Sequence, residues 1–325
     1  MIDKIWKRLT APPGSAQKSS ETRKGKSDVL HGGCQDYAGT VFTDEADAQG
    51  LQQAEAAMKK LSSLVGLQGV KEQVEKLTAF AWMMRMREAN GFSNQPLSLH
   101  MAFKGNPGTG KTTVARILGE VLFSVGVLET PTVVEVSRSD LVGEYIGQSL
   151  PKVNKVISRA KGGILLIDEA YSVVRSDSMR DYGYEVLDHL VKIMEDHRDE
   201  VMIIFTGYQK ELEEFLDINT GLKSRINYHM VFPDYTKEEL VEIFEALAKE
   251  RSFEVAPEAL NRLKKTIAPH PDNGRFIRNV LERSIVKKAT NLYAKKDIDN
   301  LRMITEEDIV IPPQEIKKGI VGFGR

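Results

Sequence analysis

The sequence predicts an α/β fold, in which a parallel sheet is covered by helices on both faces, followed by a smaller domain built from helices. Two observations support this prediction. Between residues 99 and 232, strand-like apolar runs alternate with segments of helical periodicity, an order that is typical of parallel sheets. After Pro233 the helical period takes over, and runs typical of strands become rare.

Residues 1–50 predict a flexible N-terminal arm, because they are rich in Pro, Gly, Ser, Lys and Asp and hold few large apolar side chains. At its start, Ile2, Ile5, Trp6 and Leu9 follow helical spacing between basic residues. Because so short a helix is only marginally stable by itself, a frayed end is favoured over an element that docks on a partner or a membrane surface.

The α/β domain is expected over residues 51–234. It opens with a helix that carries Val70, Val74 and Leu77 on one face. The run Ile164–Ile167 is wholly apolar, as strands buried on both faces are. The predicted strands are Leu99–Phe103, Thr132–Val136, Ile164–Ile167, Val201–Phe205 and Tyr228–Phe232, and helices around Val114–Val121, Val153–Ala160 and Leu187–Met194 follow the first three.

The helical domain is expected over residues 235–312. Thr236 and Glu239 have the spacing of a capping box, which opens its first helix. One strand is expected late, at Ile309–Ile311, and residues 313–325 are expected to form a tail. The helices are predicted around Leu240–Leu247, Leu260–Ile267 and Phe276–Leu281.

The composition argues against several functional classes. With 45 basic and 46 acidic side chains, the net charge of -1 gives no general attraction to nucleic acid, so no nucleic-acid partner is expected. The only cysteine, Cys34, excludes an intrachain disulfide framework and a Cys-based zinc site. No apolar run suits a transmembrane segment, and Lys4, Lys7 and Arg8 interrupt any signal-peptide core. These features predict a cytoplasmic globular protein.

A glycine-rich motif between the first strand and its helix indicates phosphate binding, since residues 105–112 match the pattern G-x-x-x-x-G-K-[ST]. Glycines let main-chain N–H groups approach phosphate oxygens, and the helix N-terminus adds partial positive charge. Lys111 is expected to contact the β- and γ-phosphates, and the Thr112 hydroxyl to bind Mg²⁺. The predicted nucleotide-binding residues of this motif are Gly105, Asn106, Pro107, Gly108, Thr109, Gly110, Lys111, Thr112 and Thr113.

Two carboxylates, Asp168 and Glu169, follow the apolar strand Ile164–Ile167. Asp168 is expected to hold Mg²⁺ through water, and Glu169 to orient and polarise the attacking water. Phosphoryl transfer depends mainly on positioning and charge stabilisation, so one acid for the metal and one for the water are sufficient. The pair therefore predicts hydrolysis of the nucleotide rather than binding alone.

Together these motifs resemble those of AAA+ ATPases, whose P-loop NTPase domain has three layers and is followed by a small helical lid. Within that superfamily, the chain is similar to the CbxX/CfxQ family, which contains stage V sporulation and red-type Rubisco activase proteins. The short arm and the absence of a helical-repeat domain favour the sporulation type over the related secretion ATPases; a Rubisco activase is the alternative. The resembling stretches are Leu99–Arg116, Gly143–Ser149, Gly163–Tyr171, Thr206–Tyr208, Leu222–Ile226 and Asn273–Asn279.

The resemblance implies a homo-oligomeric ring, a hexamer, that binds ATP and Mg²⁺ between neighbouring subunits. Val65 and Gly66 then match the segment that lies against the adenine. Arg225 matches the arginine finger that enters the next subunit's site, where it would neutralise charge on the γ-phosphate; a plain surface arginine is the alternative. Arg275 matches the sensor 2 arginine of the lid; Arg278, one helical turn later, is either a substitute for it or a solvated surface residue. Thr206 stands where AAA+ proteins often have the sensor 1 asparagine.

Tyr145, Ile146 and Gly147 resemble the loop that lines the ring channel, with an aromatic side chain to grip an extended polypeptide client. The alternative is that Tyr145 packs in the subunit core. The segment Arg175–Gly183 is either a second channel loop or an ordinary loop. The leading hypothesis is therefore an ATP-driven protein remodeller, and the alternatives are a nucleic-acid motor and a scaffold whose assembly is controlled by nucleotide.

Overall fold

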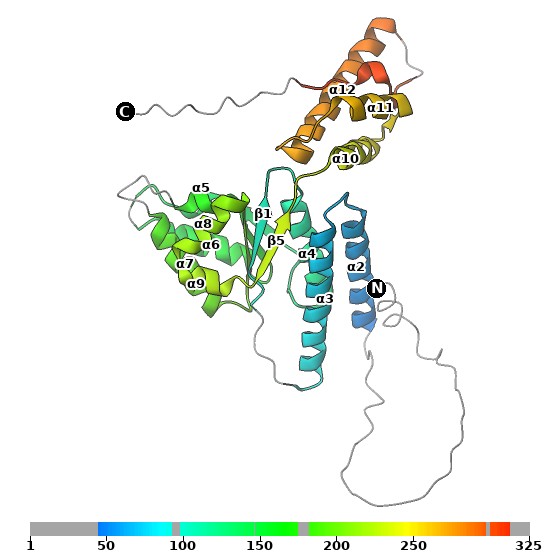
Figure 1. Cartoon of the computed structure of the whole chain (residues 1–325). Helices are drawn as coiled ribbons and strands as arrows, with labels where there is room; N and C mark the ends of the chain where they lie inside the picture. The colour runs from blue at the N-terminus through cyan, green and yellow to red at the C-terminus, as the bar shows by residue number, and fades with distance from the viewer. Residues whose placement is uncertain (1–44, 93–97, 146, 175–181, 297–299, 313–325) are drawn as a thin grey trace, which may run out of the picture.

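The computed structural model describes residues 45–92, 98–145, 147–174, 182–296 and 300–312 (Figure 1). Several expectations lie outside the described residues, so they stay predictions. They concern the short N-terminal helix, most of the arm, the channel-loop residue Ile146, most of the possible second channel loop and the C-terminal tail.

The core of the molecule is a five-stranded sheet in the order β2-β3-β4-β1-β5. All neighbouring strands are parallel, as the alternating pattern predicted. The first strand starts and ends two residues later than expected, and the fourth extends to Gly207. The strands are β1 (Met101–Gly105), β2 (Val133–Val136), β3 (Ile164–Ile167), β4 (Met202–Gly207) and β5 (Tyr228–Phe232).

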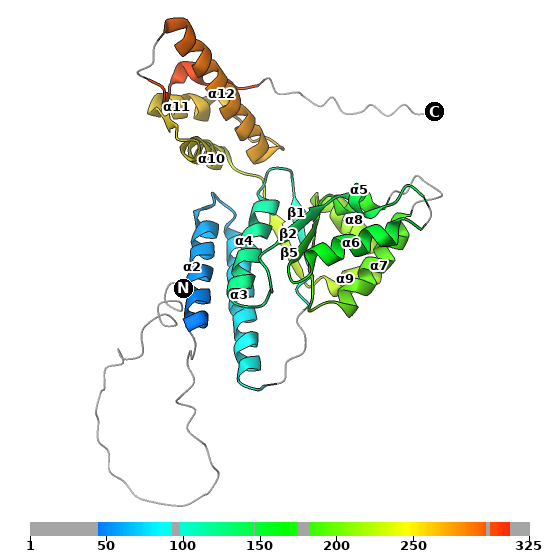
Figure 2. The same ribbon diagram turned by 180° about the vertical axis from the view of Figure 1, so that it is seen from behind.

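One face of the sheet is covered by α3 (Gln68–Ala89) and α4 (Lys111–Ser124), and α2 (Glu45–Ser63) packs on α4; the three helices lie side by side in Figures 1 and 2. Helix α2 begins before the expected start of order at Leu51. A Cβ atom on Gly50 would lie 2.6 Å from the carbonyl oxygen of Ser124, so this glycine permits close approach of α2 to α4.

The other face is covered by a group of shorter helices. Side chains alternate between the two faces along β3. Ile164 and Leu166 therefore enter the core between the sheet and helices α3 and α4, whereas Leu165 and Ile167 enter the core between the sheet and the group of shorter helices. All four side chains are fully buried, which explains the unbroken apolar run. The elements are α5 (Arg138–Leu141), α6 (Ser149–Ala160), η1 (Ala170–Val173), α7 (Gly183–Asp196), α8 (Gln209–Ile218) and α9 (Thr220–Arg225).

A helical lid follows β5, and Figure 1 shows it above the carboxyl ends of the strands. The predicted capping box is present, since the Thr236 and Glu239 side chains each bond the other's main-chain N–H. The lid comprises α10 (Lys237–Glu250), β6 (Glu254–Val255), α11 (Pro257–Thr266), α12 (Asn273–Lys295), β7 (Met303–Ile304) and η2 (Glu306–Asp308).

The expected strand at Ile309–Ile311 is wrong. Those residues have no strand structure, and the strand is instead β7, which pairs in parallel with β6. Ile309 is apolar because it is buried against the helices of the lid. A two-residue strand depends on a partner far along the chain, and the local pattern of residues does not reveal that partner.

None of the helices in the described part of the chain combines the length and the apolar character that crossing a bilayer requires.

Candidate functional site

A cavity of about 460 Å³ lies where the carboxyl ends of the strands meet the lid. Three parts of the chain line it: the segment between α2 and α3, the loops after β1, β3 and β4, and the lid helices. Ligand sites in parallel sheets commonly lie at this edge. The lining includes Leu64, Val65, Leu67, Gly105, Pro107, Gly108, Gly110, Lys111, Thr112, Thr113, Asp168, Glu169, Tyr171, Tyr208, Tyr235, Ile243, Leu247, Arg275 and Arg278.

The loop between β1 and α4 has the backbone that its glycines allow. Gly108 and Gly110 have φ values of 71° and 96°, in the left-handed region that other residues rarely adopt. Helix α4 begins at Lys111 with no side-chain cap, so the free N–H groups of its first turn face the cavity end of the loop. This is a suitable cradle for an anion.

The Lys111 ammonium group is folded back over the same loop. Its Nζ donates to the carbonyl oxygens of Gly105 and Asn106, at 2.8 Å in both cases. Burial lowers the pKa of Lys111, and the nearby Asp168 carboxylate opposes that shift. A phosphate group would give this partly buried cation a far stronger partner than two carbonyl dipoles.

The acidic pair follows β3 into the cavity. The Thr206 hydroxyl on β4 donates to Asp168 Oδ1 at 2.5 Å, which fixes the orientation of that carboxylate. Glu169 has a φ of 47°, an uncommon value for a residue other than glycine, and its side chain is exposed toward the cavity. Such local strain is typical of functional positions.

The donors for a divalent cation fit Mg²⁺. The Thr112 hydroxyl and the Asp168 carboxylate both line the cavity, and Mg²⁺ prefers oxygen ligands together with several waters. In the described part of the chain, no cluster of three or more His, Cys, Asp or Glu side chains forms a dedicated metal cage. A site with few protein ligands, completed by water and substrate phosphate, agrees with both findings.

Tyrosines that the sequence analysis did not assign form part of the wall. The Tyr171 and Tyr208 rings lie 6.0 Å apart, and Tyr235 donates its hydroxyl hydrogen to the carbonyl oxygen of Thr109 at 3.2 Å. Burial raises the pKa of all three phenols, that of Tyr235 to about 12. Only their position after a strand end could have indicated them in the sequence.

The lid is joined directly to the phosphate loop. Asn273, fully buried at the start of α12, donates to Asp234 Oδ1 at 2.7 Å and accepts from the Tyr235 main-chain N–H at 2.8 Å. Asn106 also donates to Asp234, at 2.9 Å to each oxygen. The Gly274 N–H donates to the carbonyl oxygen of Gly108 at 3.0 Å. Arg275, the residue after Gly274, is thereby held at the cavity.

The expected adenine segment lies at the other end of the cavity. Val65 lines it together with Ile243 and Leu247 of α10, which gives an apolar slot suited to a planar base. Gly66 has another role: a Cβ there would lie 2.3 Å from the Glu239 carboxylate, so the glycine lets the lid helix approach. Lys71 fixes the segment by donating to the carbonyl oxygens of Leu64 and Ser62.

Not all predicted residues meet in the cavity. Three of them lie outside its lining and support it through hydrogen bonds: Asn106 to Asp234, Thr109 to the loop backbone, and Thr206 to Asp168. Arg225 lies at the amino ends of the strands, on the side of the sheet opposite the cavity. There its carbonyl oxygen accepts a hydrogen bond from Ser98, just before β1. The five residues of β1, roughly 17 Å in length, separate the amino ends of the strands from the phosphate loop.

Tyr145 is 68% exposed, which excludes the alternative that it packs in the core. It lies between α5 and α6, and Gly147 has a φ of 81° that suits a turn. The base of this loop is fixed, because Lys152 donates to the carbonyl oxygen of Val142 and Ser149 accepts from the Gly143 N–H.

Comparison with known families gives two matches in tandem. Residues 101–234 match the ATPase family associated with various cellular activities (AAA), and residues 236–319 match the AAA lid domain. The two matches meet at the turn between β5 and α10.

Curated proteins are similar over most of their lengths. A chloroplastic ribulose bisphosphate carboxylase/oxygenase activase of Cyanidioschyzon merolae is 40% identical over 76% of this chain and 87% of that protein. Protein CbbX of Cereibacter sphaeroides is 40% identical, with 76% and 82% covered. Stage V sporulation protein K of Bacillus subtilis is 39% identical, with 82% and 86% covered. Sequence identity does not separate the activase type from the sporulation type.

Solved structures share the fold. The FIGL-1 AAA domain in complex with ADP superposes with a TM-score of 0.56 at 17% identity, over 78% of this chain and 85% of that one. At this low identity, the likeness concerns the arrangement of the sheet and the lid alone.

Proposed function

The chain belongs to the AAA family of ATPases and is of the CbbX/CfxQ type, and from this premise we propose that it forms a ring that uses Mg-ATP to remodel a protein client. As a member of the family, it hydrolyses ATP. One observation carries the proposal: Lys111, Asp168, Glu169 and Arg275 line a single cavity between the α/β domain and the lid. A nucleotide there would contact both domains.

In the proposed mechanism, the main-chain N–H groups before Lys111 and the start of α4 bind the phosphates, while Val65 and the lid hold the base. Lys111 exchanges its two carbonyl partners for phosphate oxygens. Thr112 and Asp168 would hold Mg²⁺, which neutralises charge on the phosphates when bound. Arg275 would report the state of the γ-phosphate to α12.

Glu169 is the proposed base that orients the attacking water. It follows Asp168 directly, yet its left-handed backbone turns it away from the axis of β3, so that the two carboxylates serve different functions. Thr206 supports the pair by fixing Asp168 through its hydroxyl. Hydrolysis in this scheme needs no covalent intermediate, because positioning and charge neutralisation carry the reaction.

A substitution at Glu169 tests this assignment. Glu169→Gln keeps the shape and removes the negative charge, so ATP binding should persist while turnover falls by at least about 100-fold. Calorimetry measures binding, and phosphate release measures turnover. The matched control is Glu211→Gln, an exposed carboxylate on α8 outside the cavity lining. Normal turnover in Glu169→Gln would exclude Glu169 as the base.

Arg225 is the proposed arginine finger of a shared site. It lies too far from its own phosphate loop to act within one chain, and this supports a role toward a neighbouring subunit. Arg225→Ala should abolish hydrolysis without preventing ATP binding. Mixing Arg225→Ala with Glu169→Gln subunits should restore part of the activity, since some sites would then combine an intact base with an intact finger. No recovery in mixed rings that assemble normally would contradict the shared site.

The exposed Tyr145 supports the proposal that the loop grips a polypeptide in the ring channel. Helix α5, which precedes the loop, is tied to the short helix η1 that follows Glu169, because Arg138 donates to the carbonyl oxygens of Ser172 and Val173. Tyr145→Ala should stop client remodelling and leave basal turnover within about twofold. Tyr293→Ala, at another exposed tyrosine, is the control. Unchanged remodelling would exclude the channel role.

The client is proposed from the two kinds of relatives. If the chain acts as the activase relative's name states, ribulose-1,5-bisphosphate and inhibited Rubisco should raise its turnover and Rubisco activity should recover. If it acts as a sporulation protein does, neither addition should change turnover. The same assay with single- and double-stranded DNA tests the nucleic-acid alternative, for which the balanced charge predicts no stimulation.

A further inference from the structure

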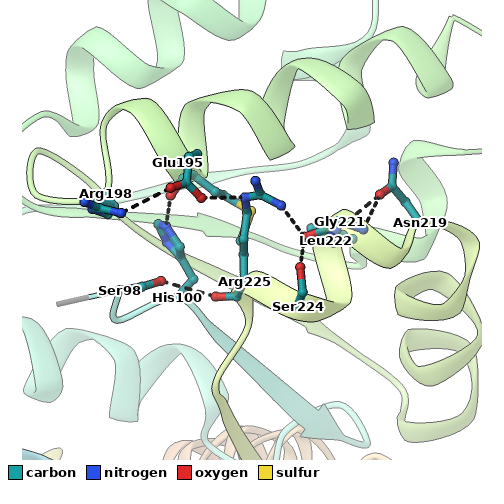
Figure 3. A network of polar contacts seen from close by, with 10 residues as sticks. Ser98, His100, Glu195, Arg198, Asn219, Gly221, Leu222, Ser224 and Arg225 are labelled. Atoms are coloured by element: carbon teal, nitrogen blue, oxygen red, sulfur yellow. Dashed lines mark hydrogen bonds and ion pairs between the residues drawn. The ribbon is translucent and has the colours of Figure 1, made fainter. Parts of the chain in front are cut away.

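The Arg225 side chain is bent back onto its own chain. Figure 3 shows it between α7 and α9, with its guanidinium directed at Glu195 and Gly221. The Nε atom lies 3.2 Å from Glu195 Oε2, and Nη1 donates to the carbonyl oxygen of Gly221 at 3.0 Å. The side chain is only 28% exposed, so this position is not that of a free surface arginine.

This position leaves Arg225 incompletely bonded. Its Nε is buried, and the ion pair with Glu195 lacks hydrogen-bond geometry. Within the described residues, it is the one buried side-chain polar atom that has no hydrogen-bond partner. Buried polar groups are almost always hydrogen-bonded, so an exception on a charged side chain indicates a site that the side chain can leave.

The surroundings of Arg225 are, in contrast, fully bonded. His100 is completely buried below it, with Nε2 at 3.0 Å from the carbonyl oxygen of Met194 and Nδ1 accepting from the Ile203 N–H at 3.1 Å. The start of α9 is capped by Asn219, which accepts from two main-chain N–H groups. The framework is therefore fixed, and only the guanidinium has reason to move.

Glu195 holds Arg225 weakly. The carboxylate is 49% exposed and also accepts from Arg198 Nη1 at 3.1 Å, so one carboxylate is shared by two guanidinium groups (Figure 3). An ion pair this exposed is easily replaced by a more highly charged anion. The triphosphate in a neighbouring subunit would be such an anion.

We propose that Glu195 is a positioning residue that holds Arg225 in a retracted position in the free subunit and releases it to the neighbour's nucleotide in the ring. The proposal depends on the proposed function of Arg225 as the finger of a shared site. Removal of the Glu195 charge should favour the extended position, and removal of Arg198 should favour the retracted one, because Glu195 then serves Arg225 alone.

The first test measures ATP turnover per subunit against protein concentration for wild type, Glu195→Gln, Arg198→Gln and a control. Glu200→Gln is the control, since it removes a carboxylate of similar exposure that pairs with Lys161 and His197 instead. Glu195→Gln should raise turnover at subsaturating protein by about 1.5- to 5-fold, the range for an exposed ion pair. Arg198→Gln should lower it, and Glu200→Gln should match wild type.

Salt gives an independent readout. Moderate salt screens this partly exposed pair, so at subsaturating protein the turnover of wild type should rise relative to that of Glu195→Gln as the salt concentration increases. A purely structural role for Glu195 predicts no such convergence of the two proteins. It predicts instead that Glu195→Gln loses turnover and melting temperature together.

A mixing experiment tests whether the effect acts between subunits. Subunits with both Glu169→Gln and Glu195→Gln cannot hydrolyse ATP, but they offer a released finger to wild-type neighbours. They should stimulate wild-type turnover more than Glu169→Gln subunits do. Equal stimulation, or an increase in turnover for Arg198→Gln alone, would overturn the proposal.

The outcomes separate this proposal from the one on which it depends. If Arg225→Ala rings hydrolyse ATP normally, the shared site itself is wrong. If Arg225→Ala is inactive and Glu195→Gln equals wild type at every protein and salt concentration, the shared site stands and the retracted position has no role.

Discussion

Asn273 is the residue whose substitution tests the joint between the lid and the phosphate loop. Its side chain accepts one hydrogen bond from the Tyr235 main chain and donates to Asp234 and to the carbonyl oxygens of Pro271 and Pro107. Asn273→Ala removes all four contacts and leaves the buried Tyr235 N–H without a partner. The amide has two hydrogens for its three acceptors, so at most three bonds exist at once. Each contributes about 1 kcal/mol net, and the unpaired N–H adds a comparable cost, so we expect a loss of about 4 kcal/mol.

The backbone contributes a second, separable cost. Asn273 has a φ of 46°, which asparagine tolerates better than alanine does. Asn273→Gly loses the same hydrogen bonds but adopts this φ freely, so it should be about 0.5–1 kcal/mol less destabilised than Asn273→Ala. The difference between the two variants isolates the backbone from the hydrogen bonds.

The assay is urea denaturation followed by circular dichroism, combined with calorimetry of ATP binding. Asn279→Ala is the control, because Asn279 is exposed on the same helix. ATP affinity should fall in Asn273→Ala, since Gly274 and Arg275 lose their fixed approach to Gly108. A change in the free energy of unfolding below about 0.5 kcal/mol, with normal ATP affinity, would refute the reasoning.

Three further predictions follow from the same geometry. Gly108→Ala should weaken ATP binding about tenfold or more, because its Cβ would lie 2.3 Å from the Asp272 carbonyl oxygen; Gly91→Ala, with a similar φ and nothing within 4 Å, should bind normally in the same calorimetry. Thr206→Val should lower kcat about tenfold by freeing Asp168, whereas Thr206→Ser, which keeps the hydroxyl, should stay near wild type in steady-state assays. Burial lowers the pKa of His100, so the unfolded chain takes up its proton first and stability is lost as the pH falls from about 6.5 through the folded-state pKa. His100→Gln should lack this component in urea denaturation from about pH 8 to about pH 5, and an identical pH dependence in both proteins would contradict the assignment.

The sheet and the phosphate loop could be predicted from the sequence because their signals are local. The apolar run Ile164–Ile167 marks a doubly buried strand, and the glycines before Lys111 mark a loop that only they can form. The capping box of Thr236 and Glu239 is likewise complete within four residues. The family resemblance rested on the same short stretches.

The small sheet of the lid could not be predicted, and the expectation at Ile309–Ile311 failed, for the same reason. Apolar residues there serve packing, whereas the strand β7 exists only because β6 lies beside it. Tyr171 and Tyr208 lie in stretches that resemble the family, but no place in the cavity wall was predicted for them or for Tyr235, because a tyrosine after a strand carries no signal of the direction of its ring.

The sequence alone thus determined the chemistry that this protein can perform, because the phosphate loop, the acidic pair and the strands that carry them are written in neighbouring residues. Only the tertiary structure decided which side chains from distant parts of the chain meet around the cavity and at the far end of the sheet. The Tyr235 hydroxyl bonds Thr109, which lies 126 residues away in the sequence. Arg225 of α9 forms an ion pair with Glu195 of α7. Such pairings depend on the packing of separate elements, and packing is a property of the whole chain rather than of any one segment.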